Sequence, residues 1–181
     1  LNHHKNSLSK QMNILDLGTG SGCIAITLAE EFKNSSVKAV DKSPEALKVA
    51  AQNAKRIGVS NIAFFEGSWY EPFMTAHADE SNKFDIIVSN PPYIDPNDPH
   101  LAGLTDEPIS ALIADNKGMA DICHIVKTAP QFLQPHGLLA IEHGYDQGEQ
   151  VRGVFLSNGF GDVITVKDYG DNERVTLGVL N

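Results

Sequence analysis

The sequence has few cysteines and no long apolar run. Its two cysteines, Cys23 and Cys123, form no CxxC pattern, which argues against a zinc or redox site of that type and suggests a reducing compartment. No run approaches the roughly 18 apolar residues that a membrane span needs, and no apolar secretory segment follows the polar first residues. We therefore expect a cytoplasmic protein that engages no membrane.

Positive charge is also scarce. The chain has 14 Lys+Arg against 23 Asp+Glu, a net charge of −9. A negative surface repels nucleic-acid phosphates, so we expect no direct nucleic-acid partner. The seven histidines form neither HExxH nor a paired zinc spacing, so we expect no metal site.

What is present is an alternation of strand and helix patterns over 181 residues, the length of one domain. Strands are expected at 12–17, 37–40, 62–65, 84–89, 138–142, 162–167 and 175–180, and helices at 23–32, 44–57, 119–133 and 147–156. The strand at 84–89 is expected to be buried on both faces, and an irregular stretch to run from 90 to about 118. The alternation predicts an α/β fold, a mostly parallel sheet closed by an antiparallel C-terminal hairpin at one edge. In such sheets, ligands bind at the carboxyl ends of the strands.

A glycine-rich turn, Asp16-Leu-Gly-Thr-Gly-Ser-Gly22, leaves the first strand and opens a helix. Its glycines permit turns that other residues rarely adopt, and a close ligand approach. The spacing is GxGxG, neither the GxGxxG dinucleotide fingerprint nor a GK[ST] phosphate loop. Asp41 ends the second strand, where it could bind ribose hydroxyls or stabilise the following helix. A tight turn without a ligand remains the alternative, but the combination resembles the class I S-adenosylmethionine (AdoMet) methyltransferases, which have a Rossmann-like fold.

A second motif, Asn90-Pro-Pro-Tyr93, leaves the fourth strand. Pro91 and Pro92 lack N–H groups but keep their carbonyl acceptors. The Asn90 oxygen and the Pro91 carbonyl can accept the two N–H bonds of a planar amino group, and Tyr93 offers a flat face. These contacts would orient the nitrogen lone pair toward a methyl donor. The alternative is a rigid turn after a strand.

Further segments make the resemblance more specific, to the HemK/PrmC family of release-factor glutamine N5-methyltransferases. They are 14–22, 40–41, 86–94, 98–101, 118–122, 142–144, 147–149 and 168–178. The resemblance implies methyl transfer from AdoMet, with S-adenosylhomocysteine as product, to the Gln of the Gly-Gly-Gln motif in peptide chain release factors. It implies a catalytic tetrad of Asn90, Pro91, Pro92 and Tyr93. It implies cofactor contacts at Asp16, Gly18, Thr19, Gly20, Ser21, Gly22, Asp41, Trp69 and Asn90, with Trp69 over the adenine.

The sequence departs from the family pattern in three places. Ser68 stands where the family often has an Asp that contacts adenine, and the loop at 103–108 is short and lacks an Arg. Few residues precede the first strand, so we expect residues 1–181 to be a single, monomeric catalytic domain without the family's N-terminal helical docking domain. A DNA or RNA amino-methyltransferase and an inactive AdoMet-binding domain stay open as alternatives, and a nicotinamide oxidoreductase is disfavoured by the GxGxG spacing.

Overall fold

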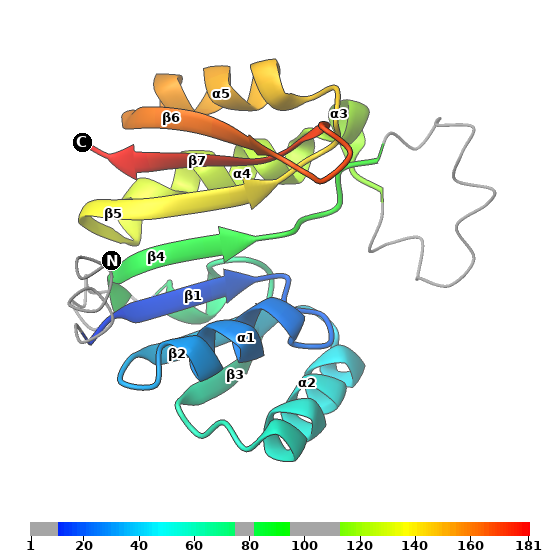
Figure 1. Ribbon diagram of the computed structural model, residues 1–181, viewed down its shortest axis with the longest axis vertical. Helices are drawn as coiled ribbons and strands as arrows, with labels where there is room; N and C mark the ends of the chain where they lie inside the picture. Colours follow the sequence, from blue (N-terminus) through cyan, green and yellow to red (C-terminus); the bar gives the residue numbers. More distant parts are fainter. Residues whose placement is uncertain (1–10, 75–81, 95–112) are drawn as a thin grey trace. The chain divides into compact units, whose positions relative to one another are not determined.

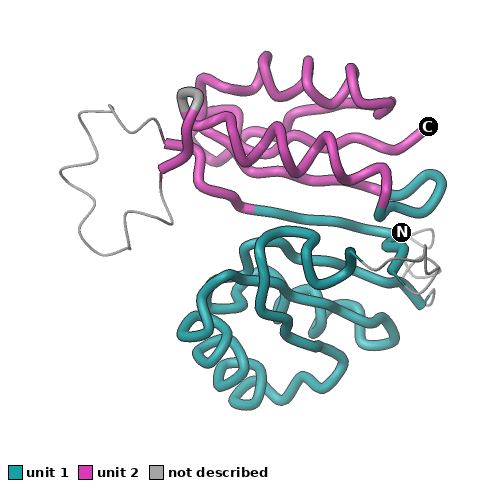
Figure 2. The backbone as a smooth tube through the Cα atoms, turned by 180° about the vertical axis from the view of Figure 1, so that it is seen from behind, with its two compact units in different colours: residues 1–89, 132–137 teal, residues 90–131, 138–181 magenta. Residues whose placement is uncertain are grey.

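Strands and helices alternate along the chain in the computed structural model, which describes residues 11–74, 82–94 and 113–181. The backbone groups into two compact units (Figure 2). Unit 1 comprises Leu1–Ser89 and Phe132–Gly137, and unit 2 comprises Asn90–Gln131 and Leu138–Asn181. The predictions for the loop at 95–112, including the short segment at 103–108, lie outside the described residues.

The strands of the described residues form a seven-stranded sheet in the order β3-β2-β1-β4-β5-β7-β6 (Figure 1). Their bounds are β1 Asn13–Leu17, β2 Ser36–Asp41, β3 Ile62–Glu66, β4 Phe84–Ser89, β5 Leu133–Glu142, β6 Phe160–Lys167 and β7 Glu173–Leu180. The pairs β1–β2, β1–β4 and β2–β3 are parallel. Strand β7 is antiparallel to both β5 and β6, and β6 lies at the edge. The predicted mostly parallel sheet with an antiparallel C-terminal hairpin is confirmed.

Unit 1 contains helices α1 (Cys23–Glu31) and α2 (Pro44–Ile57). Alanines of α1 pack against apolar residues of β1 and β2, and Figure 1 shows α1 lying across these strands. Helix α2 begins as predicted, because the Ser43 hydroxyl accepts the Ala46 N–H at 3.1 Å. It ends at Gly58, whose φ of 90° is the left-handed conformation of a helix C-terminus.

Unit 2 contains α3 (Asp115–Gly118), α4 (Ala120–Thr128) and α5 (Gly148–Ser157). Helix α5 packs on α4 and on both strands of the hairpin. Its Phe155 ring lies 5.1 Å from the Phe160 ring of β6. A Cβ on Gly178 of β7 would stand 2.6 Å from Phe155, so the glycine lets the helix approach the sheet closely.

Three expectations about the elements are corrected. The helix predicted at 119–133 ends at Thr128 and is followed by a 3₁₀ turn at Ala129–Gln131, because Pro130 cannot donate a helical hydrogen bond. Strand β5 accordingly begins at Leu133 rather than Leu138. Strand β4, by contrast, has buried residues on both faces as expected, Phe84 on one and Ile87 and Ser89 on the other. Helix α3 forms within the stretch expected to be irregular.

None of the helices in the described ranges has the length and the apolar character of a membrane span.

Candidate functional site

The glycine-rich turn between β1 and α1 has a left-handed backbone at each of its glycines. The φ angles are 73° at Gly18, 56° at Gly20 and 85° at Gly22. The N–H groups of Gly18 and Thr19 both donate to the Val40 carbonyl of β2, at 2.9 Å each. Left-handed backbone is costly for residues with a side chain, so the predicted conformational role of these glycines is confirmed.

Two of these glycines also differ in their surroundings. A Cβ on Gly22 would stand 2.8 Å from Ile26 Cδ1 and 3.0 Å from the Ala50 side chain, so Gly22 allows α1 and α2 to pack together. A Cβ on Gly20 would meet no atom within 4 Å. The turn therefore borders open space at Gly20, where a ligand could approach the backbone.

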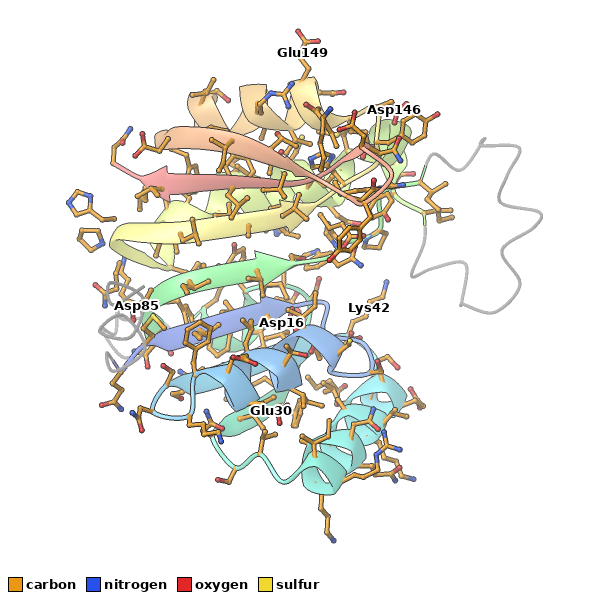
Figure 3. All side chains as sticks on the ribbon, viewed as in Figure 1. Asp16, Glu30, Lys42, Asp85, Asp146 and Glu149 are labelled. Atoms are coloured by element: carbon orange, nitrogen blue, oxygen red, sulfur yellow. The ribbon has the colours of Figure 1, made fainter. Side chains whose placement is uncertain are left out.

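Asp16, near the end of β1, stabilises the glycine-rich turn through two hydrogen bonds. Its Oδ2 accepts the Thr19 hydroxyl at 2.6 Å and the Ala25 N–H of α1 at 3.2 Å. Its Oδ1 has no hydrogen-bond partner within the described residues, although the side chain is 1% exposed. Burial raises the pKa of Asp16 to about 6, against the lowering effect of these two hydrogen bonds, and the nearby Asp41 raises it slightly further. Figure 3 labels Asp16 on β1.

Asp41, the last residue of β2, joins the turn to the start of α2. Its Oδ2 accepts the Gly20 N–H at 2.8 Å and its Oδ1 accepts the Ser43 N–H at 2.9 Å. A carboxylate oxygen can accept a second hydrogen bond, and Asp41 is only half-buried. It can therefore accept neighbouring hydroxyl groups while it holds the loop. On the turn itself, Thr19 is buried and Ser21 is exposed.

The turn after β3 is tied to the same strand end, because the Gly67 N–H donates to the Asp41 carbonyl at 3.1 Å. Trp69 follows with a left-handed φ of 52°, is half-buried, and makes no side-chain hydrogen bond within the described residues. Ser68 donates its N–H to Glu71 Oε2 at 2.8 Å. Within unit 1, Asp41 is thus hydrogen-bonded both to the glycine-rich turn, at Gly20, and to the turn that carries Trp69, at Gly67.

Tyr70, the neighbour of Trp69, was not predicted. It is fully buried, stacks on Phe132 with ring centroids 4.6 Å apart, and burial raises its pKa. This buried ring fixes the chain next to Trp69. No sequence pattern distinguishes it from an exposed tyrosine.

The tetrad Asn90–Tyr93 follows β4 directly. The last residue of that strand, Ser89, donates its hydroxyl to the Leu17 carbonyl at 2.7 Å, within unit 1. Asn90 begins unit 2 and is exposed, and its side chain makes no hydrogen bond within the described part of the chain. Pro91 is buried and Tyr93 is half-buried. The Asn90 amide can therefore bind an incoming group, while its neighbours are held in place.

Three residues without a predicted site role surround Tyr93. Its hydroxyl donates to Glu142 Oε1 at 3.2 Å, and its carbonyl accepts Gln147 Nε2 at 3.0 Å. Gly118 lies so close that a Cβ would overlap the Tyr93 carbonyl. The only sequence signal for them is that each lies in a segment resembling the HemK/PrmC family.

His143 follows Glu142 and is fully buried. Its Nδ1 lies 2.8 Å from the Gly144 carbonyl and its Nε2 lies 2.9 Å from the Thr176 hydroxyl. A neutral ring with the proton on Nδ1 satisfies both, donating to the carbonyl and accepting from the hydroxyl. Burial lowers the pKa of His143, so the neutral form is favoured. These contacts give His143 a structural role between β5 and β7.

Comparison with known proteins gives one family and many relatives. The model of a family described as "Methyltransferase domain" matches residues 8–163. The release factor glutamine methyltransferase of Salmonella typhimurium is 48% identical over 171 residues, covering 93% of this chain and 60% of that protein. The protein of the same name from Escherichia coli is 47% identical over 167 residues, covering 91% of this chain and 58% of that protein. The chain thus spans about three fifths of the length of these relatives.

Solved structures agree on the fold. The ribosomal protein L11 methylase from Lactobacillus delbrueckii subsp. bulgaricus matches with a TM-score of 0.67 and 21% identity, covering 98% of this chain and 74% of that one. A methyltransferase from Pyrococcus furiosus matches with a TM-score of 0.67 and 20% identity, covering 97% and 78%. The predicted Rossmann-like fold of the class I methyltransferases is confirmed.

Proposed function

The chain belongs to the methyltransferase domain family, and we propose that it transfers a methyl group from AdoMet to the side-chain amide nitrogen of the Gly-Gly-Gln glutamine in peptide chain release factors. The observation that carries the proposal is the 48% identity, over 93% of the chain, to a protein named release factor glutamine methyltransferase. As a further part of the proposal, residues 1–181 act as one catalytic domain, as a monomer in the cytoplasm, without a nucleic-acid partner.

The residues of unit 1 fit the chemistry of AdoMet, which would supply a methyl group on a positively charged sulfur. Asp41 offers acceptors for the two ribose hydroxyls while it holds the Gly20 N–H. The open space at Gly20 leaves room beside the backbone. Asp16 keeps one buried oxygen without a partner within the described residues, so its negative charge is poorly compensated and favours a cation bound at the turn. Trp69 is proposed to cover the adenine.

The tetrad would hold the acceptor amide. The Asn90 side-chain oxygen and the Pro91 carbonyl accept its two N–H bonds, and the Tyr93 ring packs on its planar face. An amide nitrogen is a poor nucleophile because its lone pair is delocalised, so orientation of the lone pair supplies much of the rate. The same two acceptors stabilise the positive charge that develops on the nitrogen. The proton leaves to solvent after transfer, so the chain needs no strong base here.

The test measures transfer from AdoMet labelled on its methyl group, with the label located by mass spectrometry. Acceptors are a release factor, the same factor with the Gly-Gly-Gln glutamine changed to alanine, DNA and RNA. Label on the glutamine and none on the alanine form is the expected result. Label only on nucleic acid would overturn the proposed acceptor, and AdoMet binding without transfer to any acceptor would indicate an inactive binding domain.

The variant Asn90→Ala tests the role of the tetrad. Transfer should fall by at least about a hundredfold, because two-point orientation of the amide is lost. AdoMet affinity, measured by calorimetry, should change little. The exposed C-terminal Asn181, changed to alanine, is the matched control and should keep full activity. Loss of AdoMet binding in Asn90→Ala would assign Asn90 to the cofactor instead.

A further inference from the structure

The tetrad cannot fix its own backbone. Pro91 and Pro92 lack N–H groups, and residues 90–93 have no regular secondary structure. Support begins just after them, where Ile94 forms a bridge with Ile113 and its carbonyl accepts the Ala114 N–H at 3.1 Å. The shape of the tetrad therefore depends on groups that come from elsewhere in unit 2.

Two side chains from elsewhere in unit 2 contact Tyr93, one at its ring hydroxyl and one at its backbone carbonyl. Glu142, the last residue of β5, accepts the ring hydroxyl at 3.2 Å. Gln147, just before α5, donates to the backbone carbonyl at 3.0 Å. These partners are 49 and 54 residues away along the sequence, so the contacts exist only in the folded chain. Together they restrain both the ring and the peptide of Tyr93.

The orientation of Gln147 is set by a second contact. The Gly144 N–H donates to Gln147 Oε1 at 2.8 Å, so the amide nitrogen is the atom that faces the Tyr93 carbonyl. If the amide were flipped, its nitrogen would face the Gly144 N–H and its oxygen would face the Tyr93 carbonyl, so neither hydrogen bond could form. Gln147 is 9% exposed, and Gly118, with a φ of 77°, closes on the same carbonyl. A buried amide with both ends used is a rigid support.

Arg174, near the start of β7, supplies positive charge near Glu142. Arg174 Nε donates to Asp168 Oδ2 at 3.0 Å, and this hydrogen bond is the main cause of the raised pKa of Arg174. The negative charge of Glu142 also raises the pKa of Arg174. The acceptor of the Tyr93 hydroxyl is thus a carboxylate with a cation nearby.

We propose that Glu142 and Gln147 are positioning residues that hold Tyr93, and through it the tetrad, in the geometry that grips the acceptor amide. The inference rests on the proposed function and deepens it. Neither residue touches the acceptor. Misplacement of a reacting group by about 1 Å can cost about a hundredfold in rate, so loss of this support acts on transfer rather than on cofactor binding.

The main test is Gln147→Glu, which keeps an oxygen for the Gly144 N–H but puts a second oxygen against the Tyr93 carbonyl. At pH 8 and well below the Tm, kcat/KM for the release factor should fall by about tenfold or more, with AdoMet affinity within error of the unchanged chain. The buried carboxylate should also lower the Tm at this pH. As the pH falls, the buried carboxyl becomes protonated and can donate to the carbonyl, so relative activity should recover. A merely structural role predicts that AdoMet binding is lost and recovers in parallel with transfer, and a pH-independent loss matched by weaker AdoMet binding would overturn the proposal.

The other end of Tyr93 is tested by a double-mutant cycle. Tyr93→Phe and Glu142→Ala should each lower kcat/KM, and the double variant should lose no more than the larger single loss, because one hydrogen bond is removed in all three. Fully additive losses would contradict the proposal. Glu149→Gln, an exposed position at the start of α5 labelled in Figure 3, is the matched control and should keep full activity.

An NMR measurement separates this inference from the proposed function. Ring signals of ¹³C-labelled tyrosine are recorded, with the Tyr93 signal identified by its loss in Tyr93→Phe. Gln147→Glu should shift the Tyr93 signal and leave that of the fully exposed Tyr169 unchanged. An unmoved Tyr93 signal would refute the support by Gln147. A shifted signal in a chain that never methylates release factor would refute the acceptor and leave the support standing.

Discussion

The buried carboxyl of Asp16 should make the stability of the chain fall as the pH rises from about 4 to 6. Its folded pKa is about 6 against 3.8 for the free side chain. Between these values, the folded chain binds more protons than the unfolded chain, so the free energy of unfolding decreases with pH. Below 3.8 the group is protonated in both states, and above about 6 it is ionised in both.

The magnitude follows from the two pKa values. One pKa unit of difference corresponds to 1.36 kcal/mol, so the full titration of Asp16 is worth about 3 kcal/mol. Because the unfolded side chain is already partly ionised at pH 4, raising the pH from 4 to 7 should cost about 2–3 kcal/mol of stability. The side chain is 1% exposed, so solvent does little to screen this charge. The physical source is the burial of a carboxylate whose Oδ1 has no partner within the described residues.

The variant Asp16→Asn isolates this effect. Its carbonyl oxygen can still accept the Thr19 hydroxyl and the Ala25 N–H, but the side chain carries no charge at any pH. The buried amide nitrogen lowers the free energy of unfolding of the variant by about 1–3 kcal/mol, and by the same amount at every pH. The pH dependence of the difference between the two chains is therefore the decisive quantity, and it removes the contributions of all other titrating groups.

The assay is urea unfolding of both chains at intervals from pH 4 to 8. The stability of Asp16→Asn relative to the unchanged chain should rise by about 2–3 kcal/mol between pH 4 and 7. A difference that stays constant with pH would refute the reasoning, because it would mean that Asp16 ionises as easily in the folded chain as in the unfolded one. A cationic ligand favours ionised Asp16, so AdoMet should bind the unchanged chain more tightly above pH 6 and Asp16→Asn with little pH dependence.

Two further predictions concern the turn and the hairpin. Gly22→Ala should lower the free energy of unfolding by about 2–4 kcal/mol in urea titrations, because overpacking adds to left-handed strain. Gly20→Ala should cost only the about 1–2 kcal/mol of left-handed strain, yet weaken AdoMet binding in calorimetry, and equal costs at the two glycines would contradict the packing argument. The pKa of His143 is lowered, so its contribution to stability is complete above about pH 6.5 and is lost as the pH falls. His143→Gln should lack this loss in urea titrations from pH 5 to 8, and parallel pH curves for the two chains would show that His143 charges freely in the folded state.

Local features of the fold could be predicted because their causes lie within a few residues. Ser43 and Gly58 bound α2 through a side-chain cap and a left-handed φ, both short-range effects. The glycines at 18, 20 and 22 predict a left-handed turn because glycine adopts positive φ angles readily. The start of β5 was misplaced for the opposite reason. The carbonyl of Phe132, just before β5, accepts the Phe84 N–H at 2.8 Å, and that pairing partner lies almost fifty residues away.

The candidate site divides in the same way. The sequence by itself determined which groups are present: the GxGxG turn, the acid that ends the second strand, and a tetrad whose two prolines offer acceptors without donors. Only the tertiary structure decided that Asp16 is buried and that its pKa is therefore raised. It alone also decided that the Gln147 side chain donates a hydrogen bond to the Tyr93 carbonyl. Burial and contacts across 54 residues depend on how the elements pack, and no pattern of neighbouring residues encodes them.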